Sequence, residues 1–163
     1  MDDRSLLETY RDGAGRLLAR VRSLPEGVID FRPALEDAWT VREHIIHLVD
    51  SEINAFIRIK SIIAQPGSSC YVMDEDAWTR NIRRKNEDLD KYIAAFGLMR
   101  GMVYDLLVDE DVANWDRDYF TRDYNNEVAR ITIRKALELY VRHCAAHLEY
   151  IDRNVREFNR TVV

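Results

Sequence analysis

The chain has four histidines, and they fall into two pairs whose spacing suits metal binding. His44 and His47 are three residues apart, and His143 and His147 are four residues apart. Side chains at these spacings point the same way on an α-helix, about one turn from each other. A pair of neutral imidazoles placed like this can chelate a zinc, nickel, copper or iron ion. Such a pair is also common as a solvated or capping feature, so the spacing permits a metal site without requiring one.

The position of each histidine relative to the apolar face of its segment sharpens this hypothesis. At about 100° per residue, His143 and His147 lie on the shoulder of an apolar stripe, where the wall of a cleft would be. His47 points almost opposite the apolar centre of its segment. That placement weakens the interpretation of His47 as a core histidine. By itself it is as compatible with plain exposure to solvent as with a position in a metal site.

Four segments carry the apolar period of a helix and must position these side chains. We expect helices over about residues 5–23, 40–64, 86–108 and 132–159. Thr40 followed by Glu43 predicts a capping box at the start of the second helix, and Gln65-Pro66-Gly67 predicts its end. The apolar face of that helix carries one charged exception, Glu52. Residues 68–84 are interpreted as a long loop or a partly helical crossover.

The pattern changes between residues 109 and 130. Residues 115–120 and 127–131 flank Tyr124-Asn125-Asn126, which predicts a small hairpin or an irregular excursion. Four long helices in a chain of 163 residues predict an all-α fold. We expect an antiparallel four-helix bundle with a long crossover and an irregular segment between the third and fourth helices. The length predicts a single domain over residues 1–163.

The composition disfavours several classes of protein. Apolar residues make up 47% and charged residues 33% of the chain, which supports a folded core and argues against disorder. The net charge of −5 disfavours nucleic-acid binding through a basic patch. No apolar run approaches the roughly 18 residues that span a membrane. Two cysteines, Cys70 and Cys144, form no disulfide framework, so we expect a cytoplasmic protein.

The residues around His47 resemble a known signature. The segment Trp39–Glu52 contains a Trp-Thr step, a glutamate, His47-Leu48 and an acidic residue, in the order of the DinB/YfiT-like superfamily of metal-dependent enzymes. A second signature of that family, His-x-x-x-His near the C-terminus, is matched by His143 and His147. Each motif is short, but their joint occurrence is much more specific than either alone, and the resemblance spans nearly the whole chain.

The resemblance implies an unusual crossover in the bundle and a three-histidine metal site made by His47, His143 and His147. Three histidines leave a divalent ion one or more open positions for water or substrate, as in a catalytic site. Zinc or nickel is the preferred ion, because all-imidazole sites accept both. The family motif does not require His44. We expect His44 to contact a ligand from outside or to be exposed, and not to bind the ion.

Two carboxylates lie near His47 in the sequence. Asp50 follows it by three residues and Glu43 precedes it by four. Either could orient an imidazole or act as a catalytic base, although a surface carboxylate and a capping glutamate are the simpler interpretations. Cys144 lies on an apolar stripe and is interpreted as core. Four aromatic residues of the irregular segments either line a pocket mouth or cover the bundle ends: Trp78, Trp115, Tyr119 and Tyr124.

Two classes of function are compatible with these residues. The resemblance implies a metal-dependent enzyme, either a hydrolase or a thiol-dependent S-transferase or isomerase, acting on a small molecule such as a low-molecular-weight thiol. The alternative is a non-catalytic helical module for metal binding or stress-associated dimerisation. We expect a homodimer. A role with nucleic acids, suggested by the damage-inducible family name, is opposed by the acidic balance of the chain.

Overall fold

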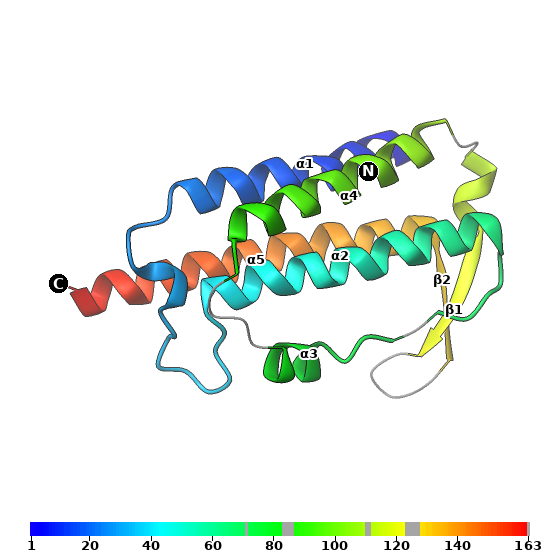
Figure 1. The fold of residues 1–163 in the computed structure, drawn as a ribbon. Helices are drawn as coiled ribbons and strands as arrows, with labels where there is room; N and C mark the ends of the chain where they lie inside the picture. The colour runs from blue at the N-terminus through cyan, green and yellow to red at the C-terminus, as the bar shows by residue number, and fades with distance from the viewer. Residues whose placement is uncertain (71, 83–86, 110–111, 123–127, 163) are drawn as a thin grey trace.

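The computed structural model describes residues 1–70, 72–82, 87–109, 112–122 and 128–162, and its main feature is a bundle of long helices (Figure 1). The long helices are α1 (Asp3–Arg22), α2 (Val41–Ala64), α4 (Leu89–Val108) and α5 (Ile133–Val162). The shorter elements are the helix α3 (Glu75–Asn81), the 3₁₀ turns η1 (Val28–Asp30) and η2 (Val112–Asp116), and the strands β1 (Asp118–Arg122) and β2 (Val128–Thr132). The predicted all-α four-helix bundle is confirmed.

The helices follow a different order around the bundle than along the chain. Both α1 and α2 pack against α4 and α5. In Figure 1, α2 and α4 run in one direction, and α1 and α5 run in the other. Because α2 and α4 are parallel neighbours, the chain must return along the length of the bundle between them. The segment that carries α3 makes this return on the outside of α2, as the predicted crossover (Figure 1).

Local sequence sets the ends of α2. The Thr40 hydroxyl accepts a hydrogen bond from the Glu43 amide at 3.2 Å, and the Glu43 carboxylate accepts one from the Thr40 amide at 2.8 Å, so the predicted capping box is present. After Ala64, Gly67 takes a positive φ of 78°, which glycine adopts without steric cost. The predicted start of the third long helix at Asn86 lies outside the described residues, and α4 begins at Leu89.

The hairpin predicted before the last helix is present. β1 and β2 pair antiparallel, from Asp118 opposite Thr132 to Arg122 opposite Val128. The expected turn at Tyr124-Asn125-Asn126 lies outside the described residues. The aromatic side chains of Trp115 and Tyr119 are buried against the ends of the helices, and the half-buried Trp78 lies in α3.

The core consists of two apolar clusters placed one after the other along the bundle. The cluster nearer the hairpin includes Leu7, Ile59 and Leu107. The other includes Leu17 and Cys144, and the thiol of Cys144 is fully buried as predicted. Each large apolar side chain buried in this way stabilises the fold by about 1.5–3 kcal/mol. Among the helices of the described residues, none is both long enough and apolar enough to cross a membrane.

Candidate metal centre

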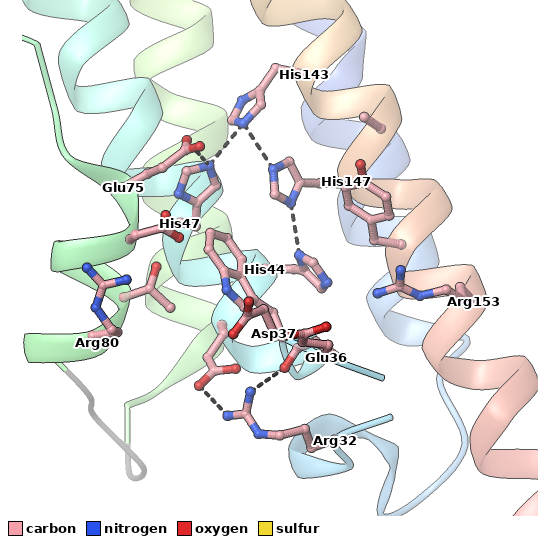
Figure 2. A pocket seen from close by; sticks show the side chains of 17 residues that line it. Arg32, Glu36, Asp37, His44, His47, Glu75, Arg80, His143, His147 and Arg153 are labelled. Carbon is pink, nitrogen blue, oxygen red and sulfur yellow. Dashed lines mark hydrogen bonds and ion pairs between the residues drawn. The ribbon is translucent and has the colours of Figure 1, made fainter. Parts of the chain in front are cut away.

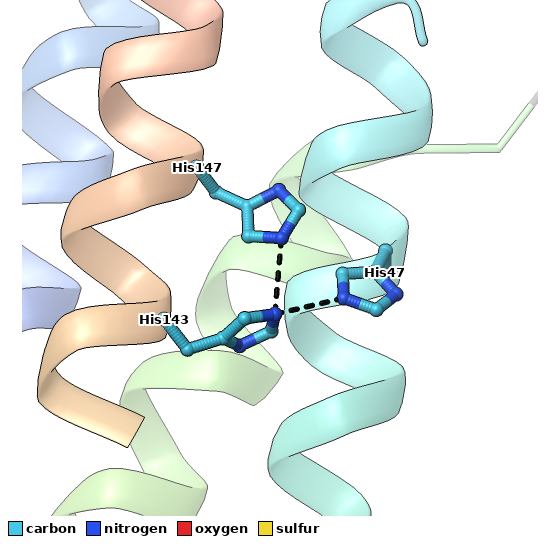
Figure 3. A group of neighbouring side chains, drawn as sticks. All are labelled: His47, His143 and His147. Carbon is cyan, nitrogen blue, oxygen red and sulfur yellow. Dashed lines mark hydrogen bonds between the residues drawn. The ribbon is translucent and has the colours of Figure 1, made fainter. Parts of the chain in front are cut away.

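Three histidines from α2 and α5 bring one nitrogen each toward a common point (Figure 3). The Nε2 atom of His143 lies 2.9 Å from Nε2 of His47 and 3.0 Å from Nε2 of His147. One potential ligand atom from each of the three residues lies within 4.8 Å of the other two. Nitrogens bound at about 2.0–2.1 Å to a tetrahedral zinc ion lie about 3.3 Å apart. The structure thus brings together all three residues predicted as ligands, at separations that suit one ion.

The chemistry of these nitrogens also fits a cation. A neutral imidazole has one N–H group and one lone pair, so Nε2 of His143 cannot form good hydrogen bonds with both neighbours at once. Burial lowers the pKa of His143 to about 4, of His47 to about 3 and of His147 to about 2. The charge of Arg100 adds to the effect for His143, and the repulsion between neighbouring protonated histidines adds to it for His47 and His147. All three rings are therefore neutral near pH 7, which is the form that binds a metal.

His47 is buried even though it points away from the apolar centre of its helix. Its side chain is 3% exposed. The centroids of the Trp39 and His47 rings are 5.0 Å apart. The Oε2 atom of Glu75 lies 3.6 Å from Nε2 of His47. The helical wheel left solvent exposure open because it describes α2 alone. The loop before α2 and the crossover helix α3 supply the cover.

His44 is buried beside the cluster and touches one of its members. Its side chain is 3% exposed, so the alternative of an exposed His44 is wrong. Its Nδ1 atom lies 2.9 Å from Nδ1 of His147, on the side of that ring away from the other two histidines (Figure 2). A partner in this position fixes which nitrogen of a ligating histidine carries the proton. His44 therefore contacts a candidate ligand from outside, the other alternative for this residue.

The histidines form one wall of a pocket of about 670 Å³ (Figure 2). The pocket lies between the loop before α2, the start of α2, the helix α3 and the middle of α5. Its aromatic lining is Trp39 and Tyr150, and none of the four aromatic residues proposed from the sequence is among its described lining. Tyr150 lies three residues after His147, so the helical period would have been enough to find it. The charged groups on the wall are Arg32, Glu36, Asp37, Glu43, Glu75, Asp76, Arg80 and Arg153.

The two carboxylates suggested by the sequence lie in different surroundings. Glu43 lines the pocket, but its Oε1 atom accepts a hydrogen bond from Arg32 at 2.6 Å and its Oε2 atom accepts one from the Thr40 amide. Burial acts to raise the pKa of Glu43, but the hydrogen bonds from Arg32 and Thr40 prevail and leave it lowered. Asp50 is half-buried, and it is not among the described residues that line the pocket.

Glu75 is the carboxylate that the structure places beside a candidate ligand histidine and that the sequence did not reveal. It lies in the first turn of α3, and its carboxylate is the one that approaches Nε2 of His47. Burial, together with the nearby Asp76 and Asp74 carboxylates, raises the pKa of Glu75. A raised pKa suits a group that accepts and returns a proton near neutrality. The acidic run at residues 74–76 indicates a helix start, but it carries no information on which histidine α3 will cover.

A sequence model of the DinB superfamily matches residues 9–151, most of the chain. The chain belongs to the DinB superfamily. The resemblance carried by the segment Trp39–Glu52 and by the histidine pair of α5 is therefore confirmed. One relative, from Bacillus subtilis (strain 168), carries the name "Putative metal-dependent hydrolase YfiT". It is 27% identical over 145 residues, which cover 89% of this chain and 79% of the relative.

Solved structures share the fold. The structure of YfiT from Bacillus subtilis, described as a four-helix bundle of unusual topology, matches with a TM-score of 0.85 at 25% identity, covering 98% of this chain and 90% of that one. The mycothiol-dependent maleylpyruvate isomerase matches with a TM-score of 0.68 at 13% identity, covering 93% of this chain and 61% of that one. At that identity the second match shows a common fold alone.

Proposed function

We propose that this protein is a metal-dependent enzyme in which His47, His143 and His147 hold one divalent ion, zinc or nickel, beside a pocket for a small molecule. The observation that carries the proposal is the convergence of three imidazole nitrogens on the wall of that pocket. Three protein ligands leave an ion at least one open position. The pocket gives a substrate access to that position, and a relative named as a metal-dependent hydrolase supports the assignment.

Two reactions suit such a site. A divalent ion held there would lower the pKa of a coordinated water or thiol toward neutrality. Hydrolysis is supported by the name of the Bacillus subtilis relative. Transfer or isomerisation with a low-molecular-weight thiol is the second candidate, supported by the shared bundle of the mycothiol-dependent isomerase.

In this proposal Glu75 accepts the proton that the reaction releases. Its carboxylate lies beside a ligand histidine, and its side chain is partly exposed, so it can exchange the proton with solvent. The raised pKa places it nearer to neutrality than an ordinary glutamate. Glu43 is not the proton acceptor in this proposal, because its two oxygens accept hydrogen bonds from Arg32 and from the Thr40 amide at the start of α2. Trp39 shields His47 and His147 from bulk water.

The test starts from purified protein that is stripped of metal and reloaded with zinc or nickel. We expect about one equivalent of retained ion, and turnover in an ester-hydrolysis or thiol-transfer screen that depends on it. Glu75→Gln should keep the ion and lower turnover about 100-fold. Glu149→Gln is the matched control, because Glu149 is an exposed carboxylate on α5 outside the pocket lining. It should leave metal retention and turnover unchanged.

The same measurements separate the alternatives. Retained metal without turnover in either screen would favour the non-catalytic metal-binding or dimerisation module. Failure of the wild-type protein to retain zinc or nickel would overturn the proposed metal site itself.

A cytoplasmic location and a homodimer are part of the same proposal. Cys70 and Cys144 are both free, which suits a reducing compartment. Light scattering on the purified protein measures the oligomeric state, and a mass near the 19.2 kDa of one chain would exclude the dimer.

A further inference from the structure

The contact between His44 and His147 determines which nitrogen of His44 carries a proton. When Nε2 of His147 directs its lone pair at an ion, Nδ1 of the same ring carries the N–H group. That group lies 2.9 Å from Nδ1 of His44 and donates to the lone pair there. His44 therefore carries its own proton on Nε2. This step rests on the proposed function, because the ion fixes the tautomer of His147.

The pocket wall then holds two buried donors that lack an acceptor. Nε2 of His44 is buried and has no hydrogen-bond partner, and the same is true of Nε of Arg153. Among the residues that the structure describes, no carboxylate forms an ion pair with Arg153. A buried donor without an acceptor is costly, so a ligand that supplies one gains affinity.

Both donors belong to the same part of the pocket. The rings of His44 and Tyr150 are stacked, with centroids 5.6 Å apart, and the guanidinium carbon of Arg153 lies 5.2 Å from the centroid of the Tyr150 ring. Figure 2 shows Arg153 reaching from α5 toward His44.

The surroundings admit a negatively charged ligand at this end. Tyr150, which packs on both donors, is 43% exposed, and the described residues give it ring contacts and no hydrogen bond, so no hydrogen bond has to break for its ring to turn aside. The acidic pair Glu75 and Asp76 comes from α3, on the opposite side of the pocket from α5 (Figure 2). Glu43 is neutralised by Arg32, and the remaining wall carboxylates, Glu36 and Asp37, belong to the loop before α2 and not to α5.

We propose that Arg153 and His44 form an anion-binding subsite, and that the substrate carries a carboxylate beside the group that meets the ion. A carboxylate offers two oxygens to N–H donors, and a guanidinium group binds it through two parallel hydrogen bonds. An uncharged hydroxyl in the same place would pair with fewer donors and would not neutralise Arg153. The subsite therefore selects acidic substrates over neutral ones of the same size.

The test compares two small thiols on the zinc-loaded protein by calorimetry: 3-mercaptopropionate, which carries a carboxylate, and 2-mercaptoethanol, which does not. We expect the wild-type protein to prefer 3-mercaptopropionate by about tenfold or more. Arg153→Gln should lose most of that preference. Arg153→Lys should keep part of it, because lysine retains the positive charge but cannot form the two parallel hydrogen bonds of a guanidinium group. Arg156→Gln removes an exposed arginine one turn along α5 and should change nothing.

A second measurement does not depend on the ion. In NMR spectra of the arginine Nε–H groups, propionate should shift the signal of Arg153 and leave that of Arg156 in place, in zinc-loaded and metal-free protein alike. A protein that retains zinc and shows no preference between the thiols would overturn the subsite while leaving the metal site intact. A protein that does not retain zinc would overturn the proposed function, and the propionate titration would still decide on the subsite: an unmoved Arg153 signal would refute it.

Discussion

Two of the buried polar clusters among the described residues differ in how completely their groups are paired. In the first, Arg100 of α4 donates from Nε to Glu52 at 2.9 Å, from Nη1 to the carbonyl of Tyr10 at 2.7 Å and from Nη2 to the carbonyl of Tyr140 at 3.2 Å. The hydroxyl of Tyr10 donates to the other oxygen of Glu52. Gly13 provides the space, since a Cβ atom there would clash with Nη1 of Arg100.

The three-histidine cluster is also largely buried, with His143 half-buried, but its polar groups are incompletely paired. Its three Nε2 atoms face one another, and Nε2 of the adjoining His44 has no hydrogen-bond partner. It also lines the pocket described above, and Glu52 and Arg100 are not among the described residues that line that pocket. Burial of polar groups therefore does not by itself mark a functional site. In the paired cluster the polar groups satisfy one another. The cluster whose donors and lone pairs are left over at a pocket is the one that can receive an ion and a ligand.

Breaking the paired cluster should give the largest effect. Arg100→Met leaves Glu52 buried without its cation, so we expect the free energy of unfolding to fall by about 3–5 kcal/mol in urea titrations. The double variant Glu52→Leu with Arg100→Met should recover much of the loss, because no charge remains buried. Arg156→Met is the exposed control. Equal destabilisation by Arg156→Met would contradict the structural role of Arg100.

Removing a ligand histidine should have the opposite pattern: a large loss of zinc affinity and a small loss of stability. His147→Ala leaves two protein ligands, so we expect zinc affinity to fall by more than about 100-fold, measured by competition with a chelator. The free energy of unfolding of the metal-free protein should change less than in Arg100→Met, because the apolar clusters are untouched. A variant that still holds a full equivalent of tightly bound zinc would exclude His147 as a ligand.

Part of the contrast between the two clusters could be predicted from the sequence, because spacing along a helix shows which residues share a face. The pair His143 and His147 share a helix face, and the family signature marks His47, so the candidate ligands could be named. Glu52 could be recognised as a charge on an apolar face, but not its pairing with Arg100, which lies 48 residues further along the chain. The same limit applies to Glu75 and to the burial of His47, since both depend on how the crossover lies on α2.

His44 provides a finer comparison, because it supports the metal site without belonging to the three-histidine cluster. His44→Phe keeps a ring against Tyr150 but removes the acceptor for Nδ1–H of His147. We expect zinc affinity to fall by about 10–100-fold, less than in His147→Ala. His44→Gln, whose amide oxygen can accept the same hydrogen bond, should restore part of it. Identical zinc affinity in His44→Phe and the wild-type protein would show that the contact does not orient His147.

The smallest expected effect is in the pH dependence of the metal-free protein. Burial, and then Arg153, lowers the pKa of His44 from 6.5 to about 4, so the folded protein keeps this ring neutral at a pH where the unfolded chain protonates it. The unfolded state then binds more protons, and the stability contributed by His44 is complete above pH 6.5 and is lost as the pH falls toward 4. Glu52 acts in the opposite direction, because burial raises its pKa although Arg100 opposes the shift.

His44→Phe isolates the histidine contribution from that of the paired cluster. Between about pH 7 and about pH 5.5, one such histidine contributes about 1 kcal/mol to the loss of stability. Urea unfolding in the presence of a chelator should therefore show a loss about 1 kcal/mol smaller in His44→Phe than in the wild-type protein. Glu149→Gln should follow the wild-type curve, since that carboxylate is exposed. If His44→Phe and the wild-type protein lose the same stability over this range, burial does not keep His44 neutral in the folded protein.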